Sequence, residues 1–254
     1  MSELTATAFR WLADHHGVIT TSVLRDCNVG RTTQQRLVDA GVLRTVHKGV
    51  FVVASTPATL EQRVAGLCAA HPKGFATGPT AGALLGLRRM PRTAAIHFSI
   101  RHGARVDPLP GVLFRQTTAL RDIDRRDLGD GIVVASWARL AFDLAADLPE
   151  LDLASVLHQL LHERRVTVAE LAAIEQRLGH PARRGSGRFR RAVERLDGTA
   201  PHESDPEVRD ADGLRARGGP DPRPAAERAA GAHRSRRGRR PLGRRARHPP
   251  RAPQ

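Results

Sequence analysis

Cysteine is scarce in this sequence, and the common catalytic motifs are missing. The chain has 254 residues and two cysteines, Cys27 and Cys68, both inside apolar patterns. This excludes a disulfide framework and a CxxC metal site. No GxSxG, HExxH or Walker motif occurs. We therefore expect a protein that is not an enzyme, with no cofactor and no bound metal, in a reducing cytoplasm.

Long apolar runs are also missing. No run approaches the roughly 20 residues that a membrane-spanning helix needs, and the N-terminus lacks the basic and then apolar pattern of a secretory signal. We expect a soluble, intracellular protein that has no membrane partner.

Acidic side chains are few relative to basic ones. The sequence has 41 Lys and Arg against 26 Asp and Glu, a net charge of +15, and a pI of about 11.5. Only Lys48 and Lys73 are lysine, a bias that arginine-rich codon usage explains equally well. The excess of basic residues nevertheless points to a polyanionic partner such as DNA, RNA or an acidic membrane surface.

The first fifty residues show the pattern of three short helices. Apolar residues at helical spacing mark a first helix that Gly17 ends, and Thr20 or Thr21 caps a second helix. A third helix precedes Gly41, which stands where a C′ glycine belongs. Its expected buried stripe consists of Val29, Thr33, Leu37 and Ala40.

Two apolar runs follow the third helix. Residues 43–46 and 50–54 read as strands about the turn 47–49. Three helices and a hairpin are the plan of a winged helix-turn-helix, whose third helix enters the major groove of DNA. Arginine can contact guanine edges or phosphates, and glutamine can pair with adenine. The residues predicted to contact double-stranded DNA are Arg31, Thr32, Gln34, Gln35 and Arg36 in the helix, and Arg44, His47 and Lys48 on the wing.

Residues 57–198 carry a mixed α/β pattern. Strands are expected at 96–100, 111–116 and 132–136, and helices at 59–70, 78–87, 135–147, 151–165, 168–178 and 188–196. Thr167 and Glu170 form a capping box for one of these helices. The predicted fold class is therefore α/β (α+β), with a winged helix-turn-helix at residues 1–56, a mixed α/β domain at 57–198 and a basic tail at 199–254.

The composition changes sharply after residue 198. Proline, glycine, alanine and arginine dominate the tail, and its last 24 residues contain nine arginines and no acid. Such a segment cannot bury enough apolar surface to offset the entropy lost on ordering. We expect it to be disordered.

Three further patterns favour ordinary structural roles. His158 and His162 lie one helical turn apart and could share a metal ion, but no third ligand is evident, so partly buried or surface histidines are the better interpretation. Residues 185–190 (GSGRFR) lack the context of a phosphate loop and read as a flexible basic linker. The four aspartates of residues 121–130 alternate with arginines and predict a solvated loop.

The order of motifs resembles that of the actinobacterial AbiEi-family antitoxin-like proteins of type IV toxin–antitoxin systems. The matching segments are FRWLADHHGVITTSVLRDCNVGRTTQQRLVDAGVLRTVHKGVFVV, GFATGPTAGALLGL, IHFSIRHG, GIVVASWARLAFDLA and HERRVTVAELAAIEQRL. The resemblance implies a winged helix that binds promoter DNA and represses its own operon, a second domain that supports this role or antitoxin activity, and a cognate toxin as a partner. Two-fold operators favour a homodimer, although the sequence shows no clear dimer seam.

Members of this group often continue into a domain similar to very-short-patch-repair endonucleases. Residues 201–222 resemble the opening helix of that domain, with Glu203 or Glu207 as its acid, but the strands that should follow are replaced by an Arg/Pro/Gly/Ala string. We expect a truncated or frameshifted nuclease domain, or else a basic tail that adds nonspecific DNA affinity. Two other functions stay open: a nuclease family member that has lost its catalytic domain, and a protein-interaction module.

Overall fold

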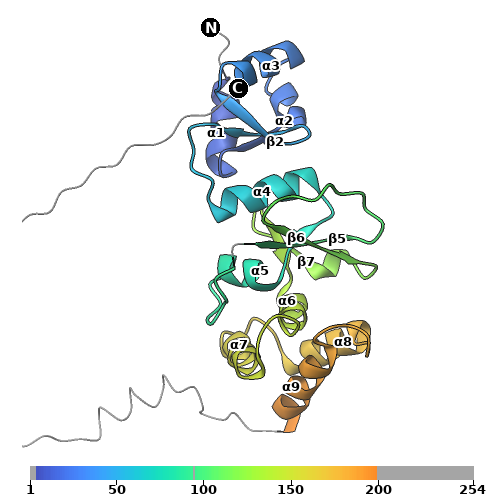
Figure 1. Ribbon diagram of the computed structural model, residues 1–254. Helices are drawn as coiled ribbons and strands as arrows, with labels where there is room; N and C mark the ends of the chain where they lie inside the picture. The colour runs from blue at the N-terminus through green and yellow to red at the C-terminus, as the bar shows by residue number, and fades with distance from the viewer. Residues whose placement is uncertain (1–3, 94, 199–254) are drawn as a thin grey trace, which may run out of the picture. The chain divides into compact units, whose positions relative to one another are not determined.

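The computed structural model describes residues 4–93 and 95–198 (Figure 1). The predicted tail at 199–254, with Glu203 and Glu207, lies outside the described residues. Among the helices that are described, none is long and apolar enough to cross a membrane.

Residues within one helical turn set an end of each of the first three helices. They are α1 (Ala6–Asp14), α2 (Thr21–Asp26) and α3 (Arg31–Asp39). The Thr20 hydroxyl caps α2 by accepting from the amide of Val23 at 3.3 Å, as expected. Gly17 ends the first helical segment with a φ of +74° and donates to the carbonyl of Leu12. Gly41, with a φ of +68°, follows the C-cap of α3 and confirms the predicted C′ glycine.

A three-stranded antiparallel sheet completes this part of the chain. Its strands are β1 (Val18–Thr20), β2 (Leu43–His47) and β3 (Val50–Val53), in the order β1-β3-β2. The predicted hairpin is confirmed, and Gly49 allows its turn with a φ of +72°. The sequence did not reveal β1, because three residues are too few to show a strand period.

The two faces of this sheet contribute to two hydrophobic clusters. Ile19 and Leu43 pack with the apolar residues of α1, α2 and α3. Val50 and Val52 belong instead to the larger cluster, which includes the buried face of α4 (Leu60–Ala70). The α4 helix contacts all three strands of this sheet and also β4 of the second sheet.

The second sheet is mixed and has five strands in the order β6-β5-β4-β8-β7. Neighbours β5 and β6, and β4 and β8, pair in parallel, and the other two pairings are antiparallel. The strands are β4 (Phe75–Ala76), β5 (Ile96–Arg101), β6 (Val112–Thr117), β7 (Arg125–Asp127) and β8 (Val133–Ala135). The chain is thus of the mixed α/β class, which confirms the predicted fold class.

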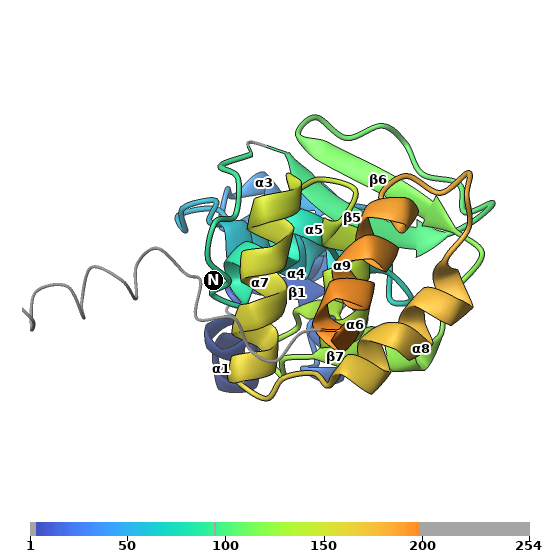
Figure 2. The same ribbon diagram turned by 90° about the horizontal axis from the view of Figure 1, so that it is seen from below.

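Five more helices accompany this sheet: α5 (Gly78–Leu84), α6 (Trp137–Leu144), α7 (Glu150–His162), α8 (Val168–Leu178) and α9 (Ser186–Gly198). The predicted capping box of Thr167 and Glu170 starts α8. Figure 2 shows α6, α7, α8 and α9 gathered together. The helix α6 packs against α7 and α8, and α9 packs against both of these. Phe189 of α9 is fully buried, 5.1 Å from the ring of Phe142.

Two expectations for the connecting segments are wrong. Residues 121–130 are not simply a solvated loop, because they form a 3-10 turn (Asp122–Asp124) and the strand β7, and Asp124 is fully buried. Residues 185–190 are not a flexible linker, because α9 begins at Ser186 and Phe189 anchors it in the core.

Candidate nucleic-acid interface

The helix α3 has one buried face and one exposed face. Its buried positions are Gln34 and Leu37, with Val38 half-buried beside them. These positions follow the i, i+3, i+4 spacing of one helical face. Of the four residues predicted to be buried, Leu37 and Val29 are buried. Thr33 is only half-buried and Ala40 is exposed, so the prediction is wrong for Ala40.

Gln34 corrects the prediction for this helix. Its side chain is 6% exposed, and its Nε2 donates to the carbonyl of Val29 at 2.8 Å. The amide was expected to point outward toward a base edge. It points inward because position 34 lies on the same helical face as Leu37, and because the Val29 carbonyl supplies a partner that makes burial of the amide tolerable.

Four of the predicted residues in α3 share the exposed surface. They are Arg31, Thr32, Gln35 and Arg36. Arg36 Nη2 donates to Thr33 Oγ1 at 3.2 Å, and Gln35 Nε2 donates to Asp39 Oδ1 at 2.8 Å. Asp39, the single acid of this helix, lies at its far end, so the first two turns present only positive or neutral side chains.

The N-terminus of α3 is open. Its N-cap is Gly30, which has no side chain to accept from the first amides, and no acid occupies the first turn. A Cβ added to Gly30 would meet no atom within 4 Å. Uncapped amides and the positive end of the helix dipole favour an anion such as a phosphate. Arg31 lies directly beside this end.

The hairpin brings two more exposed cations, Arg44 on β2 and Lys48 in the turn. His47 differs from them because it is half-buried. A Cβ added to Gly66 of α4 would lie 3.8 Å from the ring of His47, so the imidazole faces that helix. Burial, and secondarily the neighbouring His71, lowers the pKa of His47. Because its ring faces α4, His47 is less accessible than Arg44 and Lys48 for the predicted contact with DNA.

The α/β region contains a buried polar cluster that no sequence motif predicted. Arg139 of α6 is 1% exposed, and its Nε lies 2.9 Å from Asp143 Oδ2. Its Nη1 lies 3.4 Å from Asp124, which also pairs with Arg177 of α8. The i, i+4 spacing of Arg139 and Asp143 was visible in the sequence, but nothing marked the pair as buried.

A second ion pair lies close to this cluster. Arg115 Nη2 of β6 contacts Asp147 at 2.6 Å and donates to His97 Nδ1 at 3.1 Å. Burial, and then the charge of Arg115, lowers the pKa of His97, although Asp147 opposes the shift. This group links β5 and β6 to the end of α6.

The histidine pair considered as metal ligands is at the surface. His158 and His162 are both exposed on α7. Within residues 4–93 and 95–198, no group of three or more His, Cys, Asp or Glu is placed to hold a metal ion.

Comparison with known proteins found a distant similarity to a solved structure. No family model matches the sequence, and no curated protein matches it. Among solved structures, the chain is similar to the crystal structure of the RV2827C protein from Mycobacterium tuberculosis, with 17% sequence identity and a TM-score of 0.48. That match covers 74% of this chain and 75% of the other. What the protein does therefore has to follow from its own residues.

Proposed function

We propose that the protein is a sequence-specific DNA-binding transcriptional regulator of antitoxin type. In this proposal the three helices and the small sheet act as a winged helix-turn-helix. The protein represses its own toxin–antitoxin operon in the cytoplasm. A cognate toxin is its protein partner. The antitoxin element rests on the AbiEi-family resemblance of the sequence. The DNA-binding element rests on the surface described above.

The observation that carries the proposal is the exposed face of α3. Arg31, Thr32, Gln35 and Arg36 lie together on it, with no acid before Asp39. A recognition helix uses its N-terminal residues on base edges, and here those residues are a guanidinium, a hydroxyl and an amide. Arg31 and Gln35 are proposed to read bases, because both side chains offer paired hydrogen-bonding groups that suit guanine and adenine.

The remaining cations are proposed to hold the DNA backbone. Arg36 extends from the same face, and Arg44 and Lys48 lie on the hairpin that serves as the wing. Gln34 and His47 are left out of the proposed contacts, because the first is hydrogen-bonded in the core and the second faces α4.

Footprinting of the purified protein on the DNA upstream of its own gene tests this function. The proposal predicts a protected segment with two-fold related half-sites, and a protection that weakens steeply as salt rises, because counterions are released from the phosphates. Uniform weak protection along the duplex, or none at low salt, would favour a protein-interaction module instead. Cleavage of plasmid DNA in the presence of Mg²⁺ would favour the nuclease alternative.

A further inference from the structure

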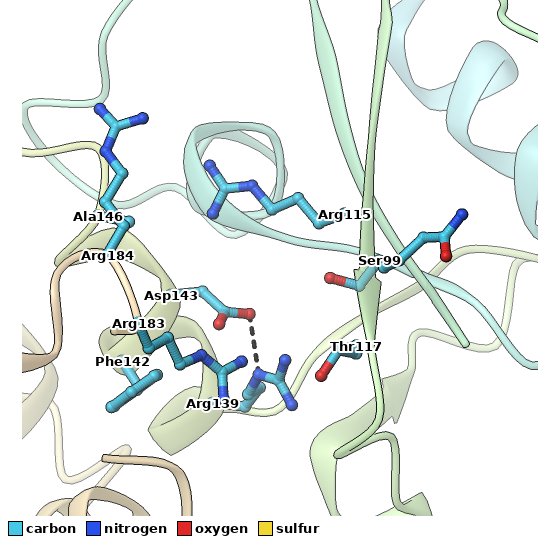
Figure 3. A pocket seen from close by; sticks show the side chains of 10 residues that line it. Ser99, Arg115, Thr117, Arg139, Phe142, Asp143, Ala146, Arg183 and Arg184 are labelled. Carbon is cyan, nitrogen blue, oxygen red and sulfur yellow. Dashed lines mark hydrogen bonds and ion pairs between the residues drawn. The ribbon is translucent and has the colours of Figure 1, made fainter. Parts of the chain in front are cut away.

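A cavity of about 250 Å³ lies where the parallel strands β5 and β6 face α6 (Figure 3). Ser99 of β5 and Arg115 and Thr117 of β6 line it from the carboxyl-terminal halves of their strands. This is the edge at which sheets with parallel strands commonly bind ligands. The opposite wall comes from α6 and from the connection between α8 and α9.

The arginines around the cavity differ in whether their charge is balanced. Arg139 is paired with Asp124 and Asp143, and Arg115 is paired with Asp147. In contrast, Arg183 in the cavity and Arg184 at its rim have no carboxylate within ion-pair distance in the described part of the chain. The cavity therefore has an excess of positive charge on the side of the α8–α9 connection.

Contacts other than a direct ion pair hold Arg183 in place among the described residues. Its guanidinium lies 5.0 Å from the centre of the Phe142 ring, and its Nη1 donates to the Leu178 carbonyl at 3.5 Å. Burial, and then the charge of Arg139, lowers the pKa of Arg183, although the charges of Asp143 and Asp124 oppose the shift. An anion in the cavity would relieve both effects, because it would replace lost hydration and offset the repulsion.

The hydroxyl of Ser99 is a second, independent sign of a ligand. Ser99 is 1% exposed, and its side chain has no hydrogen-bond partner among the described residues. Figure 3 shows the hydroxyl directed into the cavity, with the Thr117 side chain nearby. A hydroxyl can both donate and accept a hydrogen bond, so this group is suited to bond a ligand that enters the cavity.

The connection that carries the two arginines is firmly seated. Gly185 has a φ of +86°, and a Cβ there would lie 2.5 Å from the backbone nitrogen of Ala146. Ser186 Oγ accepts from the amide of His180 at 2.9 Å, and Arg188 donates to the carbonyls of Ala145 and Leu148. Because these contacts fix the backbone beside Arg183, the cavity is organised before any ligand arrives.

We propose that this cavity binds the phosphate group of a small phosphate monoester. A guanidinium and hydroxyls together match phosphate, whose three terminal oxygens can accept from Arg183, Ser99 and Thr117 at once. A carboxylate has fewer acceptors and less charge. The volume is below the roughly 300 Å³ at which pockets for drug-sized ligands begin, which suits a small ester. This site is independent of the surface proposed to bind DNA.

Isothermal titration of the full chain with inorganic phosphate and with glycerol phosphate tests the proposal. We expect saturable binding of one equivalent of either probe. Ser99→Ala and Arg183→Lys should each weaken it about tenfold, as expected for the loss of a hydrogen bond to a charged group. Arg92→Lys, at an exposed arginine before β5, should leave the affinity unchanged. Ser99→Ala should also keep the melting temperature of the ligand-free protein, because its hydroxyl has no partner to lose.

Three results would overturn the proposal. The first is no saturable phosphate binding by the unaltered chain, and the second is equal affinity in Ser99→Ala, Arg183→Lys and Arg92→Lys. The third concerns DNA as the source of the phosphate. If Ser99→Ala weakened duplex DNA binding as much as phosphate binding, the cavity would hold a backbone phosphate and no small ester. We expect duplex binding to be unchanged by Ser99→Ala.

Discussion

The side-chain amide of Gln34 donates to the backbone carbonyl of Val29 at 2.8 Å, within the core below α3. The next residue, Gln35, is exposed and donates to Asp39. Two adjacent glutamines of one helix thus have different environments, since one bonds in the core to the connection before the helix and the other lies at the surface, bonded within the helix.

The two glutamines should differ in how much they contribute to the stability of the folded protein. Gln34→Ala should lower the free energy of unfolding by about 1–3 kcal/mol, because it leaves the buried Val29 carbonyl unpaired. Gln35→Ala should change it by less than about 0.5 kcal/mol, because the side chain is exposed. Urea unfolding of both variants measures this difference. Equal losses would mean that Gln34 does not anchor the helix.

The buried arginine of α6 should be far more important for stability than an exposed one. Arg139→Met removes a positive charge that balances the buried carboxylates of Asp124 and Asp143. Removing one partner of a buried pair typically lowers the free energy of unfolding by about 3–5 kcal/mol. Arg165→Met is the matched control, because Arg165 is exposed and pairs with Glu163 at 3.4 Å, an arrangement worth about 0–1 kcal/mol. Urea unfolding of the two variants checks the contrast, and a loss below about 1 kcal/mol for Arg139→Met would contradict it.

Acidification should destabilise the folded protein below pH 6.5. Burial lowers the pKa values of His47, His71 and His97 from their ordinary value of 6.5. The unfolded chain therefore binds these protons more readily, so the free energy of unfolding falls as the pH drops through this range. His47→Gln should make that dependence shallower, whereas His102→Gln, at an exposed position, should not. Thermal melts below pH 6.5 measure how the melting temperature changes with pH. If this pH dependence were equal in the unaltered protein and both variants, His47 would have no role in it.

The proposed wing makes a separate prediction about salt. Arg44→Ala and Lys48→Ala should each lower affinity for all duplexes alike, and each should reduce the slope of log affinity against log salt by about one. Arg92→Ala, whose side chain is exposed before β5, provides the charge-matched control and should keep the slope. If the wing variants kept the slope of the unaltered protein, the hairpin would not contact phosphates.

Features set by neighbouring residues could be predicted from the sequence. The cap of α2 by Thr20, the ends of helices at Gly17 and Gly41, and the capping box of Thr167 and Glu170 all depend on residues within one helical turn. The hairpin of β2 and β3 followed from its turn residues in the same way.

Features set by distant residues could not be predicted. The strands β1, β4 and β7 have only two or three residues each, too few for a period to show, and their partners lie elsewhere in the chain. Asp124 looked solvated among arginines, but its partner Arg177 is 53 positions away. Gln34 looked like an exposed polar residue because its core partner is a backbone carbonyl, which sequence patterns do not reveal.

The most direct test of the central claim is a comparison of two duplexes by fluorescence anisotropy. One carries the DNA upstream of the gene, and the other is a shuffled duplex of the same composition. The unaltered protein should prefer the upstream duplex, and the double variant Arg31→Ala, Gln35→Ala should bind both duplexes equally while keeping its fold by circular dichroism. A double variant with the original preference, or an unaltered protein that binds neither duplex at low salt, would contradict the assignment of α3 as the helix that reads DNA.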